Sequence, residues 1–407
     1  MNAPLRSETL DSLEEFRNDV RAWLQDNCPE SQRQPVTPEE QYWGGRRGSF
    51  ASDDARIWFE RMSDQGWIVP EWPVEFGGAG LGEREAKVIK EEMKALRARL
   101  PLYGLGIWML GPALLEYGSA AQKKQHLRAI VNGELRWAQG YSEPGAGSDL
   151  ASLQCKAEDM GDHFLVNGSK IWTTAGDRCD WIFCLVRTDP TVKKQEGISF
   201  LLIDLDDPGI SVTPIELING ESEFCQTFFD NVKVPKDNLV GELNKGWSVA
   251  KALLVHERKL MAELGSDSPR QVVAPNAAAR EYLEFDNGRI SDAQLRSDLV
   301  EYDMDMHAIG LTHFRTFEER QAGTRSAAPL VMKYVGTEAE KTKSELLLAI
   351  MGSQGLGWEG DGFSEQEIDT VRLWATSKAM TIAGGSSEIQ LNVIAKTILG
   401  LPQSGGS

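Results

Sequence analysis

The hydrophobic positions of this chain repeat with a helical period near both ends and with a shorter period in the middle. Before residue 134, apolar residues recur every three or four positions, a spacing that places them on one face of a helix. Ser52 or Asp53 is in place to cap the second predicted helix, whereas Cys28–Gly48 is polar and contains several prolines, so we expect a loop there. The predicted helices of this part are Leu10–Leu24, Asp53–Gln65, Glu83–Arg99 and Gly111–Asn132.

Between residues 135 and 242 the pattern changes to short runs of β-branched and aromatic residues separated by turn residues, which is typical of β-strands. One of the turn signals, Asn167-Gly168, has the composition of a hairpin turn, so we expect the chain to reverse there. The β-type runs are Asp162–Thr174, Asp180–Thr188, Ile198–Asp204, Ile210–Ile215 and Phe228–Pro235.

The helical period returns at Gly246, and only Pro269–Asp286 is less regular. The predicted helices are Trp247–Leu264, Ser291–Gln321, Ala328–Met351, Ser364–Ala383 and Ser387–Leu399. We therefore predict an α+β chain. Its expected parts are an N-terminal helical domain over residues 1–134, a middle β-sandwich or β-barrel domain over 135–242, a C-terminal helical bundle over 243–402 and a tail over 403–407.

Composition and charge exclude several classes of protein. The 407 residues, 41% of them hydrophobic, are enough for a large core, and the net charge of −18 argues against nucleic acid or an anionic membrane as partner. No run of about 18 apolar residues predicts a transmembrane helix, and the first residues lack the pattern of a secretory signal. The five cysteines and five histidines show neither Cys-x-x-Cys nor metal-ligand spacing. We expect free thiols in the cytoplasm and no metal.

One stretch, Tyr141–Asp149, fits neither a helix nor a strand, because it contains a proline and two glycines in nine residues. Proline removes a backbone donor, and glycine allows close approach of the backbone to a ligand. We interpret the stretch as a loop whose backbone N–H groups and hydroxyls face a polar ligand, such as a cofactor ring or a phosphate. On composition alone, an ordinary surface turn is the alternative.

A second candidate for chemistry is Glu257, inside the predicted helix Trp247–Leu264. No lysine or arginine shares its helical face, so a local ion pair does not account for it. Its neighbours three and four residues away are Leu253, Leu254, Leu260 and Met261. Desolvation on such a face would raise the pKa of the carboxyl group, which suits a general base. The alternative is a structural glutamate paired with a distant arginine.

The Tyr141–Asp149 loop, together with Lys170-Ile171-Trp172-Thr173-Thr174-Ala175-Gly176, resembles the flavin-binding signature of the acyl-CoA dehydrogenase family. The resemblance extends from Gly66 to Pro402. It implies that the middle β domain and a C-terminal four-helix bundle clamp FAD between them. It also implies an acyl-CoA thioester as substrate, dehydrogenated at the α and β carbons with the hydride passing to flavin N5. Electron-transfer flavoprotein is the implied acceptor, and a homo-oligomer, a dimer or tetramer, is the implied assembly.

The resemblance also suggests where the catalytic base lies. Most members carry it in a late Tyr-Glu-Gly-Thr motif, which corresponds here to Ala383-Gly384-Gly385-Ser386, so Gly384 replaces the glutamate. The isovaleryl-CoA and long-chain branches carry the glutamate just before an arginine in an earlier helix, which corresponds to Glu257-Arg258. The resemblance thus implies Glu257 as the base. It implies substrate contacts for Ser148, Arg258, Gly384 and Gly385, with the Gly384 N–H polarising the thioester carbonyl.

Roles in cofactor binding follow from the resemblance alone. Ser142 and the backbone around it would meet the pyrimidine side of the flavin, Trp172 would cover one face of the ring, and Thr174 would reach N5. Ser386 and Glu388 would approach the phosphate side across a helix N-terminus, where the helix dipole favours an anion. The complete implied set is Tyr141, Ser142, Ser148, Trp172, Thr173, Thr174, Ser386 and Glu388.

Two departures from the family pattern leave alternatives open. Asp286–Ser291 replaces an Arg-x-x-Phe-Gly segment whose arginine meets the FAD of a neighbouring subunit, and Ala349–Gly355 replaces a Gln-x-Phe-Gly-Gly stretch. A hetero-oligomer in which this chain is a non-catalytic subunit is therefore one alternative. An acyl-CoA oxidase on the same fold is another. The sequence does not fix the length or type of the acyl chain.

Overall fold

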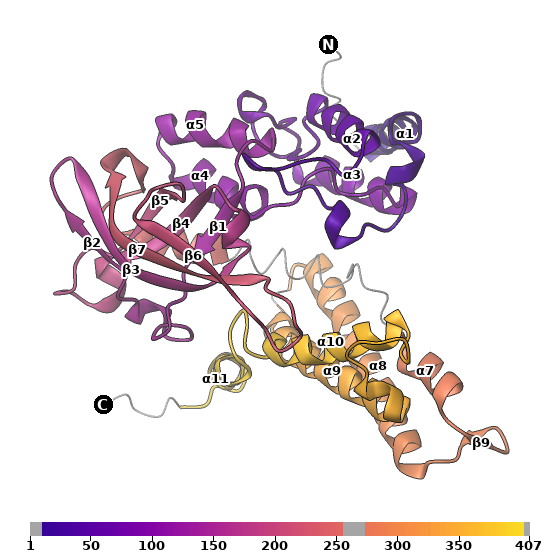
Figure 1. The fold of residues 1–407 in the computed structure, drawn as a ribbon. Coiled ribbons are helices and arrows are strands. Elements are labelled where there is room, and N and C mark those ends of the chain that lie inside the picture. Colours follow the sequence, from indigo (N-terminus) through magenta and orange to yellow (C-terminus); the bar gives the residue numbers. More distant parts are fainter. Residues whose placement is uncertain (1–9, 255–272, 325, 403–407) are drawn as a thin grey trace. The chain divides into compact units, whose positions relative to one another are not determined.

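The computed structural model describes residues 10–254, 273–324 and 326–402 (Figure 1). The chain forms two compact units: Met1–Ile215 with Ser222–Pro269, and Glu216–Glu221 with Arg270–Ser407. Along the sequence, the described elements are helical in the N-terminal part, sheet-rich in the middle and helical in the C-terminal part, as predicted. No helix among the described residues is both long enough and apolar enough to span a membrane.

The N-terminal helices form where the sequence pattern predicts them, with differences at their ends. They are α1 (Leu10–Asn27), α2 (Asp53–Asp64), α3 (Glu83–Leu96), α4 (Gly111–Tyr117) and α5 (Ala120–Val131). The Ser52 hydroxyl accepts a hydrogen bond from the Ala55 amide and caps α2. The helix α3 ends early because Arg97 adopts a left-handed conformation. The predicted helix Gly111–Asn132 is two helices, because Ser119 and Gln122 form a capping box that starts α5.

The middle part of the chain forms a single sheet of eight described strands. The strands are β1 (Trp137–Gly140), β2 (Lys156–Asp159), β3 (His163–Thr174), β4 (Trp181–Arg187), β5 (Ile198–Asp204), β6 (Ile210–Ile215), β7 (Phe224–Pro235) and β8 (Leu239–Val240). They pair in the order β6-β7-β3-β2-β4-β5-β8, and β1 pairs in parallel with β4. All residues of β4 are buried, which matches the continuous run of apolar side chains at residues 181–186; the strand ends in the buried Arg187. Sequence analysis missed the short strands β1, β2 and β8.

The hairpin turn expected at Asn167-Gly168 was wrong, because β3 continues through these residues while it pairs with β7. The register shifts between the pairs Val166–Val232 and Gly168–Phe229, so the site is a β-bulge with one extra residue on β7. A side chain at Gly168 would place its Cβ 2.8 Å from the Cα of Cys155. Glycine is therefore needed here for the close approach of two backbone segments, and its φ of 141° does not mark a turn.

The largest described core cluster of the first unit joins its helices to the sheet. Leu110 and Leu114 from the α4 region and Leu127 from α5 belong to the same buried cluster as Phe183 of β4 and Phe200 of β5. A second cluster lies among the strands, and a third packs α1, α2 and α3 together. Because the helices and the sheet share a core, loops that leave the sheet start from a rigid base.

The second unit is built around the helix α9, which contacts its other helices. Its helices are α7 (Pro275–Tyr282), α8 (Ala293–Gln321), α9 (Pro329–Met351), α10 (Glu365–Met380) and α11 (Ser387–Thr397), and a small hairpin pairs β9 (Phe285–Asp286) with β10 (Arg289–Ile290). The helix α9 contacts α7, α8, α10 and α11. Leu299 and Tyr302 of α8 pack with Leu346, Leu347 and Ile350 of α9 in its core. The segment after α10 is thus held on a packed scaffold of helices.

Candidate active site

The Tyr141–Asp149 loop leaves the sheet at the end of β1 and folds back on itself. Glu143 and Ala146 exchange two backbone hydrogen bonds of 3.1 and 3.0 Å, so Pro144 and Gly145 form a tight turn between them. Gly145 has no positive φ, and a Cβ added to it would meet no described atom within 4 Å. The described part of the fold thus gives no packing reason for this glycine, which leaves the approach of a ligand as a reason.

The loop is anchored to β3 by a buried ion pair that sequence analysis missed. Lys170 of β3 is fully buried, and its Nζ lies 2.7 Å from Oε1 of Glu143, which is 8% exposed. Sequence analysis could have found Lys170 by parity, because in the alternating pattern of β3 it shares the inward side with Phe164 and Val166. A charged residue at an inward position of a strand needs a buried partner.

Trp172 lies two residues beyond Lys170, in a second bulge of β3. The register shifts between the pairs Lys170–Thr227 and Thr173–Cys225, so β3 here carries the extra residue. Trp172 adopts a left-handed backbone with a φ of 62°, and its side chain is 51% exposed. A bulky residue in this conformation is uncommon and costs about 1–3 kcal/mol, and such residues cluster at ligand and active sites. The bulge therefore presents an indole ring at the surface, one residue after Ile171, whose amide bonds to Ser142 of the Tyr141–Asp149 loop.

The predicted flavin residues of the first unit are not equally available to a ligand. Ser142 is half-buried and Ser148 is exposed. The ring of Tyr141 is buried and lies perpendicular to the rings of Phe183 and Phe200, so it belongs to the core. The buried Thr173 hydroxyl accepts a hydrogen bond from Thr227 Oγ1 at 3.3 Å, and any contact of Thr173 with a ligand would fall to its backbone. The half-buried Thr174 follows at the end of β3.

The late glycine segment lies in the second unit, between α10 and α11. Gly384 and Gly385 have φ angles of 63° and 97°, which glycine adopts without strain. The Lys333 ammonium of α9 donates hydrogen bonds of 2.7 Å to the Gly385 carbonyl and 3.2 Å to the Met380 carbonyl at the end of α10. Burial lowers the pKa of Lys333. This lysine therefore anchors the segment, and sequence analysis did not find it because its partners are backbone carbonyls.

Ser386 is the N-cap of α11, and its Oγ accepts a hydrogen bond of 3.5 Å from the Ile389 amide. The Ser387 hydroxyl donates to Glu338 of α9 at 2.8 Å. The pKa of Glu388 is lowered by its own backbone amide and by Ser386. The Glu388 carboxylate thus already interacts with the positive end of the helix, where an incoming phosphate would compete with it.

The proposed base lies outside the described residues, as does its neighbour: these are Glu257 and Arg258. The helix that leads toward them is described over residues 246–254. At its start, a Cβ on Gly246 would lie 2.4 Å from the carbonyl carbon of Ser199, and Leu253 is buried in the core of the first unit. The beginning of this helix is therefore fixed against β5.

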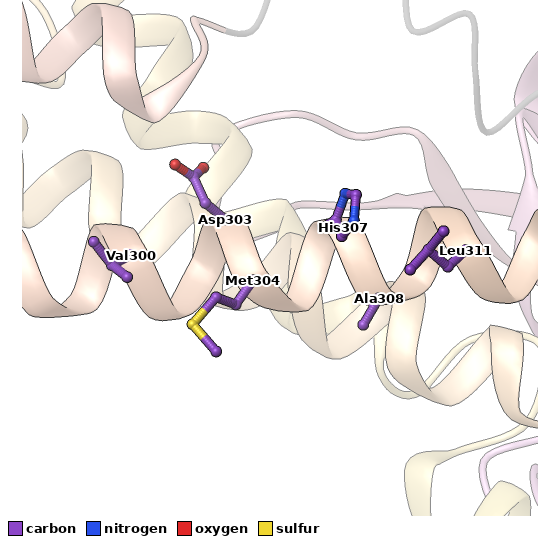
Figure 2. Close-up of a pocket in the computed structure, with 6 residues that line it drawn as sticks. All are labelled: Val300, Asp303, Met304, His307, Ala308 and Leu311. Atoms are coloured by element: carbon purple, nitrogen blue, oxygen red, sulfur yellow. The ribbon is translucent and has the colours of Figure 1, made fainter.

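A shallow hollow of about 430 Å³ lies on α8 but does not have the form of a small-molecule site. Figure 2 shows that all of its lining side chains come from this one helix, and that Asp303 and His307 project to one side while Met304 and Ala308 project to the other. Residues of one helix cannot surround a ligand, whereas binding sites usually enclose most of theirs. No cluster of metal-ligating side chains occurs among the described residues either.

Three domain families match successive parts of the chain. They are the acyl-CoA dehydrogenase N-terminal domain at residues 11–134, the middle domain at 138–232 and the C-terminal domain at 244–399. The chain belongs to the acyl-CoA dehydrogenase family. The three matches together correspond to the three-domain acyl-CoA dehydrogenase fold. Members of this family are oxidoreductases that dehydrogenate acyl-CoA thioesters and are generally flavoproteins.

Several known proteins are similar to this chain over nearly its whole length. The acyl-CoA dehydrogenase IpdE1 of Mycolicibacterium smegmatis is 33% identical over 401 residues, covering 96% of this chain and 98% of the relative. A structure described as the Tcur3481-Tcur3483 steroid ACAD is 31% identical with a TM-score of 0.71, covering 99% of this chain and 100% of the other. The ChsE4-ChsE5 complex from Mycobacterium tuberculosis is 26% identical with a TM-score of 0.68, covering 98% and 99%.

Proposed function

We propose that this acyl-CoA dehydrogenase uses FAD to desaturate an acyl-CoA thioester between the α and β carbons, with Glu257 as the base. The observation that carries the proposal is Trp172, held in a left-handed bulge with its indole 51% exposed. Close to it in the chain fold, the Ile171 amide donates a 2.9 Å hydrogen bond to the Ser142 carbonyl of the loop. An exposed aromatic face next to a loop with an unexplained glycine fits the ring system of a flavin.

Each proposed residue has a role that its chemistry can fill. Trp172 would stack on the flavin, and Ser142, Thr174 and the loop backbone would hydrogen-bond to the polar edges of the ring. The N-terminus of α11 at Ser386 would favour the phosphates. Bound FAD would supply the acceptor of the β hydride. Ser148 and Arg258 would contact the CoA part of the substrate.

The proton chemistry would fall to this chain's own side chains and backbone. Glu257 would remove the α proton from the thioester, which a carboxylate can do when burial has raised its proton affinity. The Gly384 N–H would donate to the thioester carbonyl and stabilise the negative charge that develops there. Gly384 carries no carboxylate, so it cannot act as a second base.

Purification of the chain alone tests the proposal against the alternative of a non-catalytic subunit. We expect a yellow protein that keeps FAD through gel filtration and reduces it when an acyl-CoA is added. A colourless chain that gains FAD only with a co-expressed partner would contradict the proposal. The similar structure described as a steroid ACAD supports a panel of straight, branched and steroid-bearing thioesters.

Electron-transfer flavoprotein is the acceptor that we propose, on the basis of family membership. If this is correct, reduced enzyme should be reoxidised much faster by that protein than by dissolved oxygen. Stopped-flow absorbance of the flavin measures both rates in one experiment. Equal rates, with hydrogen peroxide as product, would instead indicate an oxidase.

We also propose that a second copy of the chain covers the apolar strip on α8 in a homo-oligomer. Its exposed apolar members are spaced as in a helix–helix seam: Val300, Met304, Leu311 and Phe314. Such a strip is unfavourable in water when it is not covered. Asp303 lines the same hollow as Met304, so a further acidic group inside the strip would oppose association.

Substitution of Met304 by glutamate should therefore reduce the assembly to smaller species, because two copies would each bury an unpaired charge. Light scattering after gel filtration measures the mass. The matched control is Met160→Glu, which changes another exposed methionine, in the turn between β2 and β3. An unchanged mass for Met304→Glu would exclude α8 as the contact. If the Met304→Glu assembly loses mass because a different protein chain dissociates from it, the assembly is a hetero-oligomer.

A further inference from the structure

The buried pair Glu143 and Lys170 connects three separate segments of the first unit. The Glu143 carboxylate accepts hydrogen bonds from the Lys170 ammonium at 2.7 Å and from the backbone amides of Gln154 at 2.6 Å and Cys155 at 2.8 Å. Lys170 Nζ also donates to the Tyr141 carbonyl at 3.2 Å. The loop, the segment before β2 and the strand β3 thus meet at one ion pair.

Stability alone does not account for a pair of this kind. Removing two charges from water costs several kcal/mol per ion, and apolar residues of similar volume often stabilise a protein as well as a buried ion pair does. The pair instead provides geometric specificity, because charge-assisted hydrogen bonds are short and fix the positions of both partners. Here the fixed partners are the Tyr141–Asp149 loop and the strand position two residues before Trp172.

The geometry around the pair explains why its position matters. The next residue of β3, Ile171, donates its amide to the Ser142 carbonyl at 2.9 Å. The bulge that turns Trp172 outward starts immediately after Lys170, between its pair with Thr227 and the following pair of Thr173 with Cys225. A shift of Lys170 would therefore move both the contact to Ser142 and the backbone of Trp172.

We propose that Glu143 and Lys170 are positioning residues that hold the Tyr141–Asp149 loop at a fixed place relative to Trp172 before a cofactor binds. The proposal rests on the proposed flavin function of these two elements. A pre-organised site loses less conformational freedom on binding and therefore binds more tightly. Neither side chain is available for direct contact with a ligand at the surface, since Lys170 is fully buried and Glu143 nearly so.

The double variant Glu143→Gln/Lys170→Met tests the proposal, because it removes both charges together and keeps the approximate volumes. We expect a melting temperature close to that of the wild type and an FAD dissociation constant raised about tenfold, similar to the loss of supporting contacts at metal sites. In protein freed of FAD, amide hydrogen exchange should become faster in peptides covering residues 141–149 and 171–174. Exchange in β5 should not change.

Glu143→Asp is a second variant that keeps the charge and withdraws the carboxylate by one methylene. It should fold and weaken FAD binding less than the double variant. The matched control is Glu92→Gln, since the buried Glu92 pairs with Arg17 and Arg21 of α1 and should not affect FAD binding. Wild-type FAD affinity in both the double variant and Glu143→Asp would overturn the proposal. So would a double variant that unfolds or exchanges faster throughout the sheet, because the pair would then serve stability. If the wild type itself does not bind FAD, the proposed function fails first.

Discussion

Replacement of Glu257 by glutamine should lower the rate of acyl-CoA dehydrogenation by about 10²–10⁴-fold, the range that a positioned general base contributes. Glutamine has nearly the same shape but cannot take a proton from the α carbon. FAD content and acyl-CoA binding should remain at the wild-type level, because the substitution changes neither volume nor backbone. Steady-state turnover with a dye acceptor and the binding of a non-reactive thioester measure the two properties separately.

Glu263→Gln is the matched control, because Glu263 lies in the same predicted helix but on a different face. It should leave turnover unchanged. If Glu257→Gln dehydrogenates at the wild-type rate, the base lies elsewhere. Gly384 provides no carboxylate at the late motif, so the base would then be another carboxylate, either of this chain or of a partner chain.

Replacement of Gly168 by alanine should destabilise the first unit by about 3 kcal/mol, because it combines backbone strain with a clash in a packed sheet. The new Cβ would lie 2.8 Å from Cys155 Cα, and the φ of 141° is unfavourable for any residue with a side chain. Urea unfolding followed by tryptophan fluorescence measures the free energy of unfolding. We expect a lower midpoint with little change in slope.

Gly145→Ala is the control for this prediction. Its added methyl group would meet no described atom within 4 Å, and its backbone is not in the left-handed region. The free energy of unfolding should therefore stay within about 0.5 kcal/mol of the wild type. A Gly168→Ala variant as stable as Gly145→Ala would contradict the close approach of β3 to Cys155.

Sequence patterns predicted the helices and the longer strands well, because most helices bury one periodic face and the central strands β4 and β5 are nearly continuous apolar runs. The pattern could not tell a turn from a bulge at Asn167-Gly168. The local sequence is the same in both cases, and the deciding contact with Cys155 is remote in the chain. Such a tertiary contact overrides local preference. The helix expected to span Gly111–Asn132 failed for a different reason, because the local capping box of Ser119 and Gln122 starts a second helix and was not recognised in the sequence.

The candidate site was predictable only in part for a similar reason. Strict alternation along β3 would put Trp172 on the same inward side as Lys170, and only the bulge after Lys170 turns it outward. The partnership of Lys170 with Glu143 spans 27 residues and has no local signature. The motif resemblance identified the loop and the tryptophan, whereas the contacts that hold them in place required the structure.

Anaerobic mixing of the purified flavoprotein with the panel of acyl-CoA thioesters tests the central claim most directly. The account predicts that at least one thioester bleaches the visible absorbance of the flavin and is recovered as the α,β-unsaturated product. It also predicts that Glu257→Gln binds the same thioester without bleaching. A protein that holds FAD but is bleached by no thioester of the panel, or a Glu257→Gln variant that bleaches as fast as the wild type, would contradict it.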